Sequence, residues 1–249
     1  MIEIKNISKT FNKGEATAVK ALNNISIDIN ANEFVVIVGS NGSGKSTLLN
    51  AIAGSFICDE GTIMIDESDV TNLQDYQRTK WLSRVFQNPL QGTAPALSII
   101  DNFRLAALRT QSKSIKIGIS DTFISKVKER IATLDMGLED KINQPVGSLS
   151  GGQRQALTLL MSVMDDSKIL LLDEPTAALD PKSAATVMLT ADKLIKQLNL
   201  TAILVTHNLK EAISYGNRII QMSDGTVIKD LKKEAKAKLN VNDIFEWFQ

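Results

Sequence analysis

The sequence lacks the features that mark disulfide-stapled and metal-stapled proteins. It contains one cysteine, Cys58, and one histidine in 249 residues, so no internal disulfide can form and no pair of ligands has zinc-site spacing. A single buried thiol usually acts as a small apolar filler. The composition therefore fits a protein of a reducing compartment such as the cytosol.

Charge imbalance and long apolar runs are also missing. The 28 Lys and Arg residues are balanced by 28 Asp and Glu residues, so the basic excess usual in nucleic-acid-binding proteins is absent. No signal-like stretch stands at the N-terminus, and apolar runs such as 169–172 are far too short to cross a bilayer. We expect a globular protein that binds no nucleic acid and reaches a membrane only through a partner chain.

Buried strands alternate with helical segments, which predicts an α/β domain. The runs 34–38, 169–172 and 202–205 are continuously apolar, as strands buried on both faces of a parallel sheet should be. A helix is expected at 45–53, after the first run, and another at 151–164, before the second run. A third should begin at Asp180-Pro181, where a capping residue is followed by proline at the first helical position. Alternating isoleucines at 2, 4 and 7 and at 25, 27 and 29 predict half-buried antiparallel strands.

Residues between Pro89 and Asn143 carry a helical pattern that interrupts the α/β core. A hairpin is expected around Asp224-Gly225, and a helical tail after it. We therefore predict a single domain over 1–249. Its catalytic core with an antiparallel β subdomain spans 1–87 and 146–230, its helical subdomain 88–145, and its C-terminal helical tail 231–249.

The strongest single motif lies between a predicted buried strand and a helix, and it matches G-x-x-x-x-G-K-[ST]. Glycines let backbone N–H groups turn toward phosphate oxygens, and the helix N-terminus adds partial positive charge. Lys45 can reach the β- and γ-phosphates, and Ser46 can place its hydroxyl on Mg²⁺. The predicted nucleotide-binding loop consists of Gly39, Ser40, Asn41, Gly42, Ser43, Gly44, Lys45, Ser46 and Thr47.

Two acids follow the buried run 169–172. Such a position lies at the carboxyl edge of the sheet, where the phosphate loop also lies. Asp173 is therefore the expected Mg²⁺ partner, and Glu174 can polarise an attacking water.

The pentapeptide Leu149-Ser150-Gly151-Gly152-Gln153 matches the signature of ABC ATPases letter for letter, and the chain resembles that family over essentially its whole length. Ser150 can cap a helix whose N-terminus is an anion site. The resemblance implies a P-loop NTPase core with an N-terminal antiparallel β subdomain and an inserted helical subdomain. It also implies ATP and Mg²⁺ as cofactors.

The resemblance assigns roles to further residues. Phe11 stands where the family has an adenine-stacking aromatic, and Gln87 where it has the glutamine that touches the metal site and senses the permease. Asp180 matches the D-loop, and His207, the one histidine, matches the switch that contacts the γ-phosphate. The partner copy's nucleotide would be contacted by Ser150, Gly151, Gly152 and Gln153.

The same resemblance implies partners. Two copies would sandwich ATP head to tail and serve integral membrane permease subunits on the cytoplasmic face of the membrane. An extracytoplasmic substrate-binding protein would take part indirectly. The run Arg154 to Met161 departs from the R-V-A-I-A-R-A-L of many relatives. Together with Gly92-Thr93-Ala94-Pro95, it is similar to ATPases paired with tryptophan- or tyrosine-type binding lipoproteins. The prediction is a bacterial importer of a small solute such as an amino acid.

Other functions stay open. A cassette of this kind can power export or lipoprotein release, and soluble ABC ATPases act on ribosomes or DNA. The latter usually carry a second cassette, coiled coils or zinc modules, which this sequence does not show. A scaffold without catalysis is disfavoured because Glu174 and His207 are both present.

Overall fold

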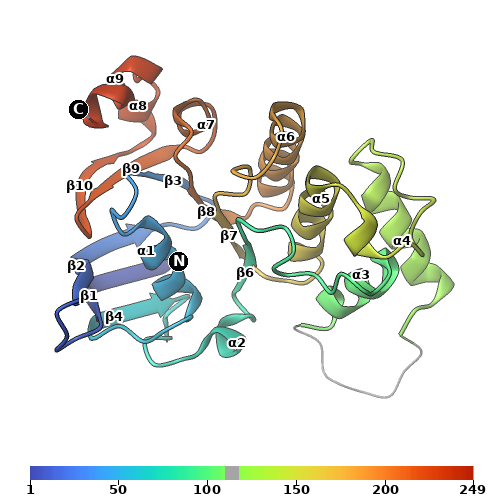
Figure 1. Ribbon diagram of the computed structural model, residues 1–249, viewed down its shortest axis with the longest axis horizontal. Coiled ribbons are helices and arrows are strands. Elements are labelled where there is room, and N and C mark those ends of the chain that lie inside the picture. Colours follow the sequence, from blue (N-terminus) through green and yellow to red (C-terminus); the bar gives the residue numbers. More distant parts are fainter. Residues whose placement is uncertain (110–117, 249) are drawn as a thin grey trace.

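The computed structural model describes residues 1–109 and 118–248, which form two sheets with helices around and between them (Figure 1). Residues 110–117 of the predicted helical subdomain and residue 249 of the predicted tail lie outside the described residues. The larger sheet has six strands in the order β10-β9-β3-β8-β7-β6, parallel except for β10, which pairs antiparallel with β9. Its strands are β3 (Phe34–Val38), β6 (Leu82–Val85), β7 (Ile169–Asp173), β8 (Thr201–Val205), β9 (Arg218–Ser223) and β10 (Thr226–Leu231).

The predicted buried strands are confirmed, because every residue of β3, β7 and β8 is buried. They occupy the middle of the sheet, where helices cover both faces. Their positions are apolar except at two strand ends, Thr201 and Asp173. The predicted hairpin around Asp224-Gly225 is also confirmed as β9 and β10.

The second sheet is antiparallel, with order β2-β1-β4-β5. It consists of β1 (Ile2–Phe11), β2 (Val19–Ile29), β4 (Glu60–Ile65) and β5 (Ser68–Asp69). Register shifts after Ile4 and a φ of 53° at Asn6 mark a bulge in β1. A bulge inserts one residue, and this explains why the isoleucines at 2, 4 and 7 break strict alternation yet are all buried.

Helix α1 (Lys45–Ala53) lies between the two sheets. Leu48, Leu49 and Ile52 pack in one apolar cluster with residues of β1, β2, β3, β7 and β8. The opposite face of the parallel sheet is covered by α6 (Pro181–Gln197), α7 (Leu209–Ser214) and part of α5 (Gly151–Ser162). The start of α1 is therefore fixed against the carboxyl edge of the parallel strands.

The C-terminal end of α1 is fixed by Arg78, a fully buried residue at the end of α2 (Asp75–Arg78). Its guanidinium donates to the carbonyls of Ala51 at 2.8 Å and Ile52 at 2.9 Å, which terminate the helix. Burial lowers the pKa of Arg78. Gly54 ends α1 with a φ of 81°, and a Cβ there would lie 2.7 Å from Arg78 Nε. Only glycine meets both conditions.

Helices α3 (Ile99–Ala107) and α4 (Asp121–Ala132) pack against α5 (Figure 1). The short 3₁₀ turn Val146–Ser148 lies between α4 and α5 in the chain. Their common cluster contains Phe103, Val127 and Ile131, and it continues into Leu157 and Leu160 of α5. Leu159 of the same helix packs on the parallel sheet. Since α5 contributes to both parts, the division at residue 145 stays a prediction.

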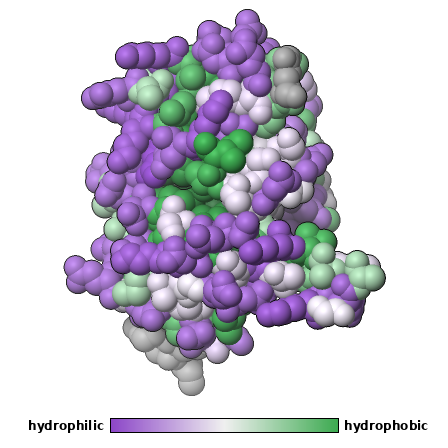
Figure 2. Space-filling view, turned by 90° about the vertical axis from the view of Figure 1, so that its left-hand side faces the viewer, coloured by the Kyte–Doolittle hydropathy of each residue, from purple (hydrophilic) through white to green (hydrophobic). Residues whose placement is uncertain are grey.

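The tail forms α8 (Lys233–Lys236), α9 (Val241–Phe245) and a 3₁₀ turn at Glu246–Phe248. Ile244 anchors it in the cluster on the parallel sheet, and Lys236 donates to the carbonyls of Tyr215 and Gly216. Burial lowers the pKa of Lys236 to about 8. Figure 2 shows the face of the molecule that lies on the left in Figure 1. On this face, hydrophobic residues form a band within a mostly hydrophilic surface. Within the described residues, no helix is long and apolar enough to span a bilayer.

Candidate functional site

The loop between β3 and α1 packs closely against β2 at Gly44. Gly44 has a φ of 97°, and a Cβ there would lie 2.6 Å from the carbonyl oxygen of Ala21, so no larger residue fits without moving β2. The hydroxyl of Ser43 is buried in this loop and has no hydrogen-bond partner among the described residues. A buried polar group without a partner costs free energy unless a ligand completes it.

Lys45 turns its side chain back into the same loop. Its Nζ donates to the carbonyls of Gly39 and Ser40, each at 2.9 Å, and the residue is 5% exposed. Burial lowers the pKa of Lys45, against the opposing effect of the nearby carboxylates of Glu174 and Asp173. A buried ammonium held only by carbonyls is a strong binding point for a phosphate.

Ser46 and Asp173 lie side by side at the carboxyl edge of β7. The Ser46 hydroxyl donates to Asp173 Oδ1 at 3.1 Å, and Arg84 Nη2 lies 2.6 Å from Asp173 Oδ2. A hydroxyl beside a carboxylate is a hard oxygen donor pair of the kind that suits Mg²⁺, which usually takes few protein ligands and completes its shell with phosphates and water. Among the described residues, no group of three or more His, Cys, Asp or Glu could hold a metal ion. The donors present therefore fit a nucleotide-bound magnesium.

Glu174 and His207 come together from adjacent parallel strands. The backbone N–H of Glu174 donates to Val205 O at 2.9 Å, and Glu174 Oε2 lies 3.0 Å from His207 Nδ1. The Glu174 side chain is 15% exposed and that of His207 58%. Glu174 also has a φ of 43°, a left-handed conformation that costs free energy outside glycine and often occurs at functional sites. The pair can hold a water molecule at a fixed place and accept its proton.

A residue that the sequence interpretation missed supports this pair. Glu211, buried in α7, accepts hydrogen bonds at 2.7 Å from both Thr176 Oγ1 and Thr206 Oγ1. Thr176 follows Glu174 by two residues, and Thr206 precedes His207. One carboxylate thus joins the two loops that carry the pair. No sequence motif pointed to it, since a glutamate four residues after a histidine is unremarkable by itself.

Replacing Glu211 with Ala is expected to separate these loops and lower the free energy of unfolding by about 1–3 kcal/mol, because the buried hydroxyl of Thr206 and the partly buried hydroxyl of Thr176 lose their acceptor. Glu211→Gln keeps an acceptor oxygen and should retain part of that stability. Urea unfolding measures both, with the exposed Glu129→Ala on α4 as control. A Glu211→Ala midpoint equal to that of the control contradicts the bridging role.

The turn at Leu149–Gln153, here the signature turn, lies at the start of α5. Ser150 Oγ accepts from the Gln153 N–H at 3.2 Å, and the Gln153 side chain accepts from the Ser150 N–H at 3.2 Å. A Cβ on Gly152 would lie 2.5 Å from Ser183 of α6, so glycine allows the two helices to approach. Ser150 and Gly151 are exposed. The described hydrogen bonds connect the signature turn to nothing in the phosphate loop of the same chain.

The remaining predicted site residues form no described side-chain hydrogen bond with Lys45, Ser46 or Asp173. Asp180 caps α6 by accepting from the N–H groups of Lys182 and Ser183, and the bonds to Ser183 hold its pKa below the usual range. Phe11 packs edge-to-face on Phe56, with ring centroids 5.4 Å apart, and is 38% exposed. Gln87 is exposed two residues after β6 ends.

A groove of about 600 Å³ lies between the parallel sheet and the helices α3 and α5. Its wall includes Tyr76 and Leu105, which are 67% and 52% exposed. Its lining further includes Arg84, Phe86, Arg109 and Met161. An apolar, open groove with two exposed large side chains is suited to receive a segment of another protein.

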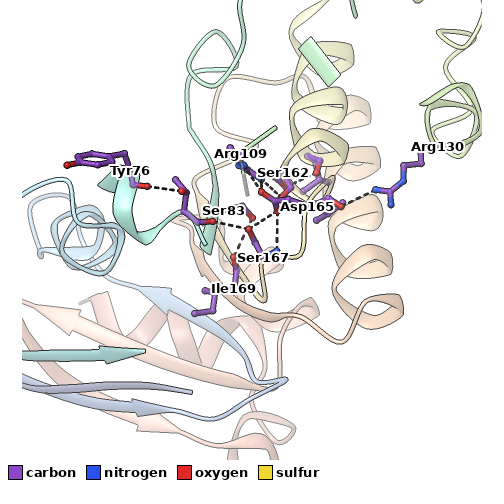
Figure 3. Close-up of polar contacts among 11 residues, drawn as sticks. Tyr76, Ser83, Arg109, Arg130, Ser162, Asp165, Ser167 and Ile169 are labelled. Carbon is purple, nitrogen blue, oxygen red and sulfur yellow. Dashed lines mark hydrogen bonds and ion pairs between the residues drawn. The ribbon is translucent and has the colours of Figure 1, made fainter. Parts of the chain in front are cut away.

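Polar contacts behind this groove hold the end of α5 in place (Figure 3). Arg109 Nε donates to Asp165 Oδ2 at 2.8 Å, and its Nη2 to Ser162 O at 3.0 Å. Arg130, from α4, donates to Val163 O at 3.0 Å. Ser167 Oγ donates to the second oxygen of Asp165 at 2.7 Å. Cations at a helix C-terminus stabilise it, so α3 and α4 are tied to the helix that begins at Ser150.

Known proteins share this sequence and this fold. A family model described as ABC transporter matches residues 22–177. The chain is 41% identical to the tyrosine transport ATP-binding protein of Clostridioides difficile, over the whole chain and 99% of that protein. It is 34% identical to the spermidine/putrescine import ATP-binding protein PotA of Aliivibrio fischeri, over 92% of the chain but 57% of that protein.

Among solved structures, the dimeric, post-hydrolysis state of the ATP-binding cassette MJ0796 bound to ADP and Pi superimposes with a TM-score of 0.81 at 31% identity. The alignment covers 94% of this chain and 99% of that one. The predicted fold class is thereby confirmed.

Proposed function

The chain belongs to the ABC transporter ATP-binding family, and on that premise we propose that its hydrolysis of ATP powers the import of an amino acid. Support for the cargo comes from the relative that is 41% identical over the full length and is named for tyrosine transport. The branch-specific residues around Gly92 and Arg154 favour the same cargo class. As a member of the family, the chain binds and hydrolyses ATP as the energy-supplying subunit of a transporter.

The observation that carries the proposed catalysis is the 3.0 Å contact between Glu174 Oε2 and His207 Nδ1, next to Asp173. In the proposed reaction Glu174 orients the attacking water and takes up its proton, while His207 holds Glu174 and faces the terminal phosphate. Lys45 leaves the carbonyls of Gly39 and Ser40 for phosphate oxygens. Mg²⁺, held by Ser46 and Asp173 with Gln87 nearby, would neutralise charge on the phosphates.

We further propose that two copies of the chain act together. Ser150 and Gly151 of the signature turn are exposed, and the turn begins a twelve-residue helix. No described hydrogen bond joins it to the phosphate loop of its own chain. A helix N-terminus favours an anion, so the second copy's ATP would complete it. Asp180, at the start of the neighbouring helix α6, would lie at the same interface. The dimeric ADP-bound relative supports this arrangement.

The groove beside Tyr76 and Leu105 is the proposed docking site for a cytoplasmic segment of the membrane permease. It lies against the helices that are tied to the signature turn through Arg109 and Arg130, so movement of α5 would reach the membrane partner. Association with the membrane would follow from this contact, on the cytoplasmic face. A separate substrate-binding protein outside the cell would deliver the amino acid.

Purification of the tagged chain with its permease from detergent-solubilised membranes, followed by reconstitution in proteoliposomes, tests the proposal. ATP enclosed in the vesicles, on the side of the cassettes, should drive accumulation of labelled tyrosine or tryptophan when the substrate-binding protein is added outside. An excess of the same unlabelled amino acid should block it. Spermidine serves as the cargo control because a similar relative is named for polyamine import. Transport of spermidine in place of the amino acids, or ATP-driven efflux, would contradict the assignment.

A further inference from the structure

Arg84 is a positively charged residue on β6, the edge strand of the parallel sheet, and it reaches the metal-binding carboxylate. In the strand register Arg84 lies opposite Leu171 of β7, two residues before Asp173. Its Nη2 is 2.6 Å from Asp173 Oδ2, and the two side chains are 13% and 12% exposed. The pair is therefore largely shielded from solvent. Two opposite charges attract each other more strongly where water is excluded.

The carboxylate of Asp173 is shared between two partners on its two oxygens. Oδ1 accepts from the Ser46 hydroxyl, and Oδ2 from Arg84. This arrangement fixes the plane of the carboxylate before any metal binds. It also places a permanent positive charge beside the metal position, because an arginine does not lose its proton in proteins.

Two residues that line the groove, Phe86 and Ser55, hold the guanidinium of Arg84 in place. Its carbon Cζ lies 4.6 Å from the centroid of the Phe86 ring, and Nη1 lies 3.5 Å from Ser55 Oγ. The Nε atom is buried and has no partner among the described residues. A buried donor without a partner costs free energy. The contact with Asp173 and the stacking on Phe86 must therefore outweigh that cost.

We propose that Arg84 is a positioning residue for ATP hydrolysis, which orients the carboxylate of Asp173 and, by its charge, weakens the binding of a divalent cation there. The inference rests on the proposed function and adds a residue that no motif assigns. Two consequences follow and have opposite signs. Loss of the guanidinium removes a repulsion and tightens cation binding, while loss of its hydrogen bond frees the carboxylate and slows the reaction.

Three variants of the full chain test this: Arg84→Met, Arg84→Gln and Arg84→Lys. Arg104→Met is the matched control, because Arg104 also stacks on an aromatic ring, Phe123, in the helical part. Binding of Mn²⁺ to the complex with the non-hydrolysable analogue AMP-PNP is measured by electron paramagnetic resonance. Turnover of ATP is measured separately at saturating Mg²⁺.

We expect Arg84→Met and Arg84→Gln to bind Mn²⁺ about fivefold more tightly, since a like charge has been removed. Their kcat should fall about tenfold, because the carboxylate is no longer held. Arg84→Lys keeps the charge, so its Mn²⁺ affinity should stay within about twofold of the wild type. If Arg84 only supported the fold, the neutral variants would show weaker Mn²⁺ binding together with a lower kcat.

Equal or weaker Mn²⁺ binding in whichever neutral variant folds would overturn the proposal, provided the wild-type chain binds AMP-PNP and Mn²⁺. An equally large gain in Mn²⁺ affinity in Arg104→Met would overturn the proposal as well. If the wild-type chain bound neither the nucleotide nor the cation, the proposed function would fail first, and this inference with it.

Discussion

Glu174→Gln is expected to reduce ATP turnover by about 10²- to 10⁴-fold while ATP binding persists. The amide keeps the shape of the side chain, but it cannot accept a proton from the attacking water. Its contact with His207, now 3.0 Å, can persist as a neutral hydrogen bond. Since hydrolysis would release the sandwiched nucleotide, the variant should also accumulate as a nucleotide-bound dimer.

Two measurements check this expectation. Release of phosphate gives the turnover, and light scattering with and without MgATP gives the mass of the particle. Glu129→Gln, an exposed glutamate on α4, is the matched control and should behave as the wild type. Turnover at the wild-type rate in Glu174→Gln would show that Glu174 is not the base.

Lys45→Ala is expected to weaken ATP binding by about ten- to a hundredfold, which corresponds to the loss of a charged hydrogen bond to phosphate. Turnover should be lost as well. The fold should survive, because burial lowers the pKa of Lys45, which means that its ammonium costs folding free energy in the empty loop. Removal of that charge therefore separates the loss of binding from any loss of stability.

The affinity of a fluorescent ATP analogue and the thermal midpoint of the unliganded chain are the two readouts for Lys45→Ala. Lys193→Ala, an exposed lysine on α6, controls for the change in net charge. Unchanged nucleotide affinity would refute the phosphate-cradle reading of the loop. A midpoint far below that of the control would instead show that Lys45 supports the fold through the carbonyls of Gly39 and Ser40.

The sequence predicted the central strands, but it left one segment before the helical subdomain without assigned elements. Strands β3, β7 and β8 are buried on both faces, so all their residues are apolar except Thr201 and Asp173 at two strand ends. The segment between Glu60 and Val85 received no assignment, although it forms β4, β5, α2 and β6. These elements are short, and in β6 the polar Ser83 and Arg84 interrupt the apolar run at the edge of the sheet.

The candidate site shows the same division. Lys45, Ser46 and Asp173 were expected together from the strand–loop–helix order, and the structure brings them together. Arg84, Glu211 and Arg78 received no role from the sequence, because each contacts at least one residue more than twenty positions away. Such contacts leave no local spacing to recognise.

The sequence by itself determined the chemistry of the chain: a lysine and glycines for phosphate, acids at strand ends, and a serine–glycine helix start. These groups act through their own type and through local backbone geometry, both of which are written in short motifs. Tertiary structure alone decided that Glu174 lies 3.0 Å from His207, that Glu211 joins their loops, and that Arg84 shares Asp173 with Ser46. The physical reason is that sheet pairing, not sequence separation, sets which side chains meet at the carboxyl edge.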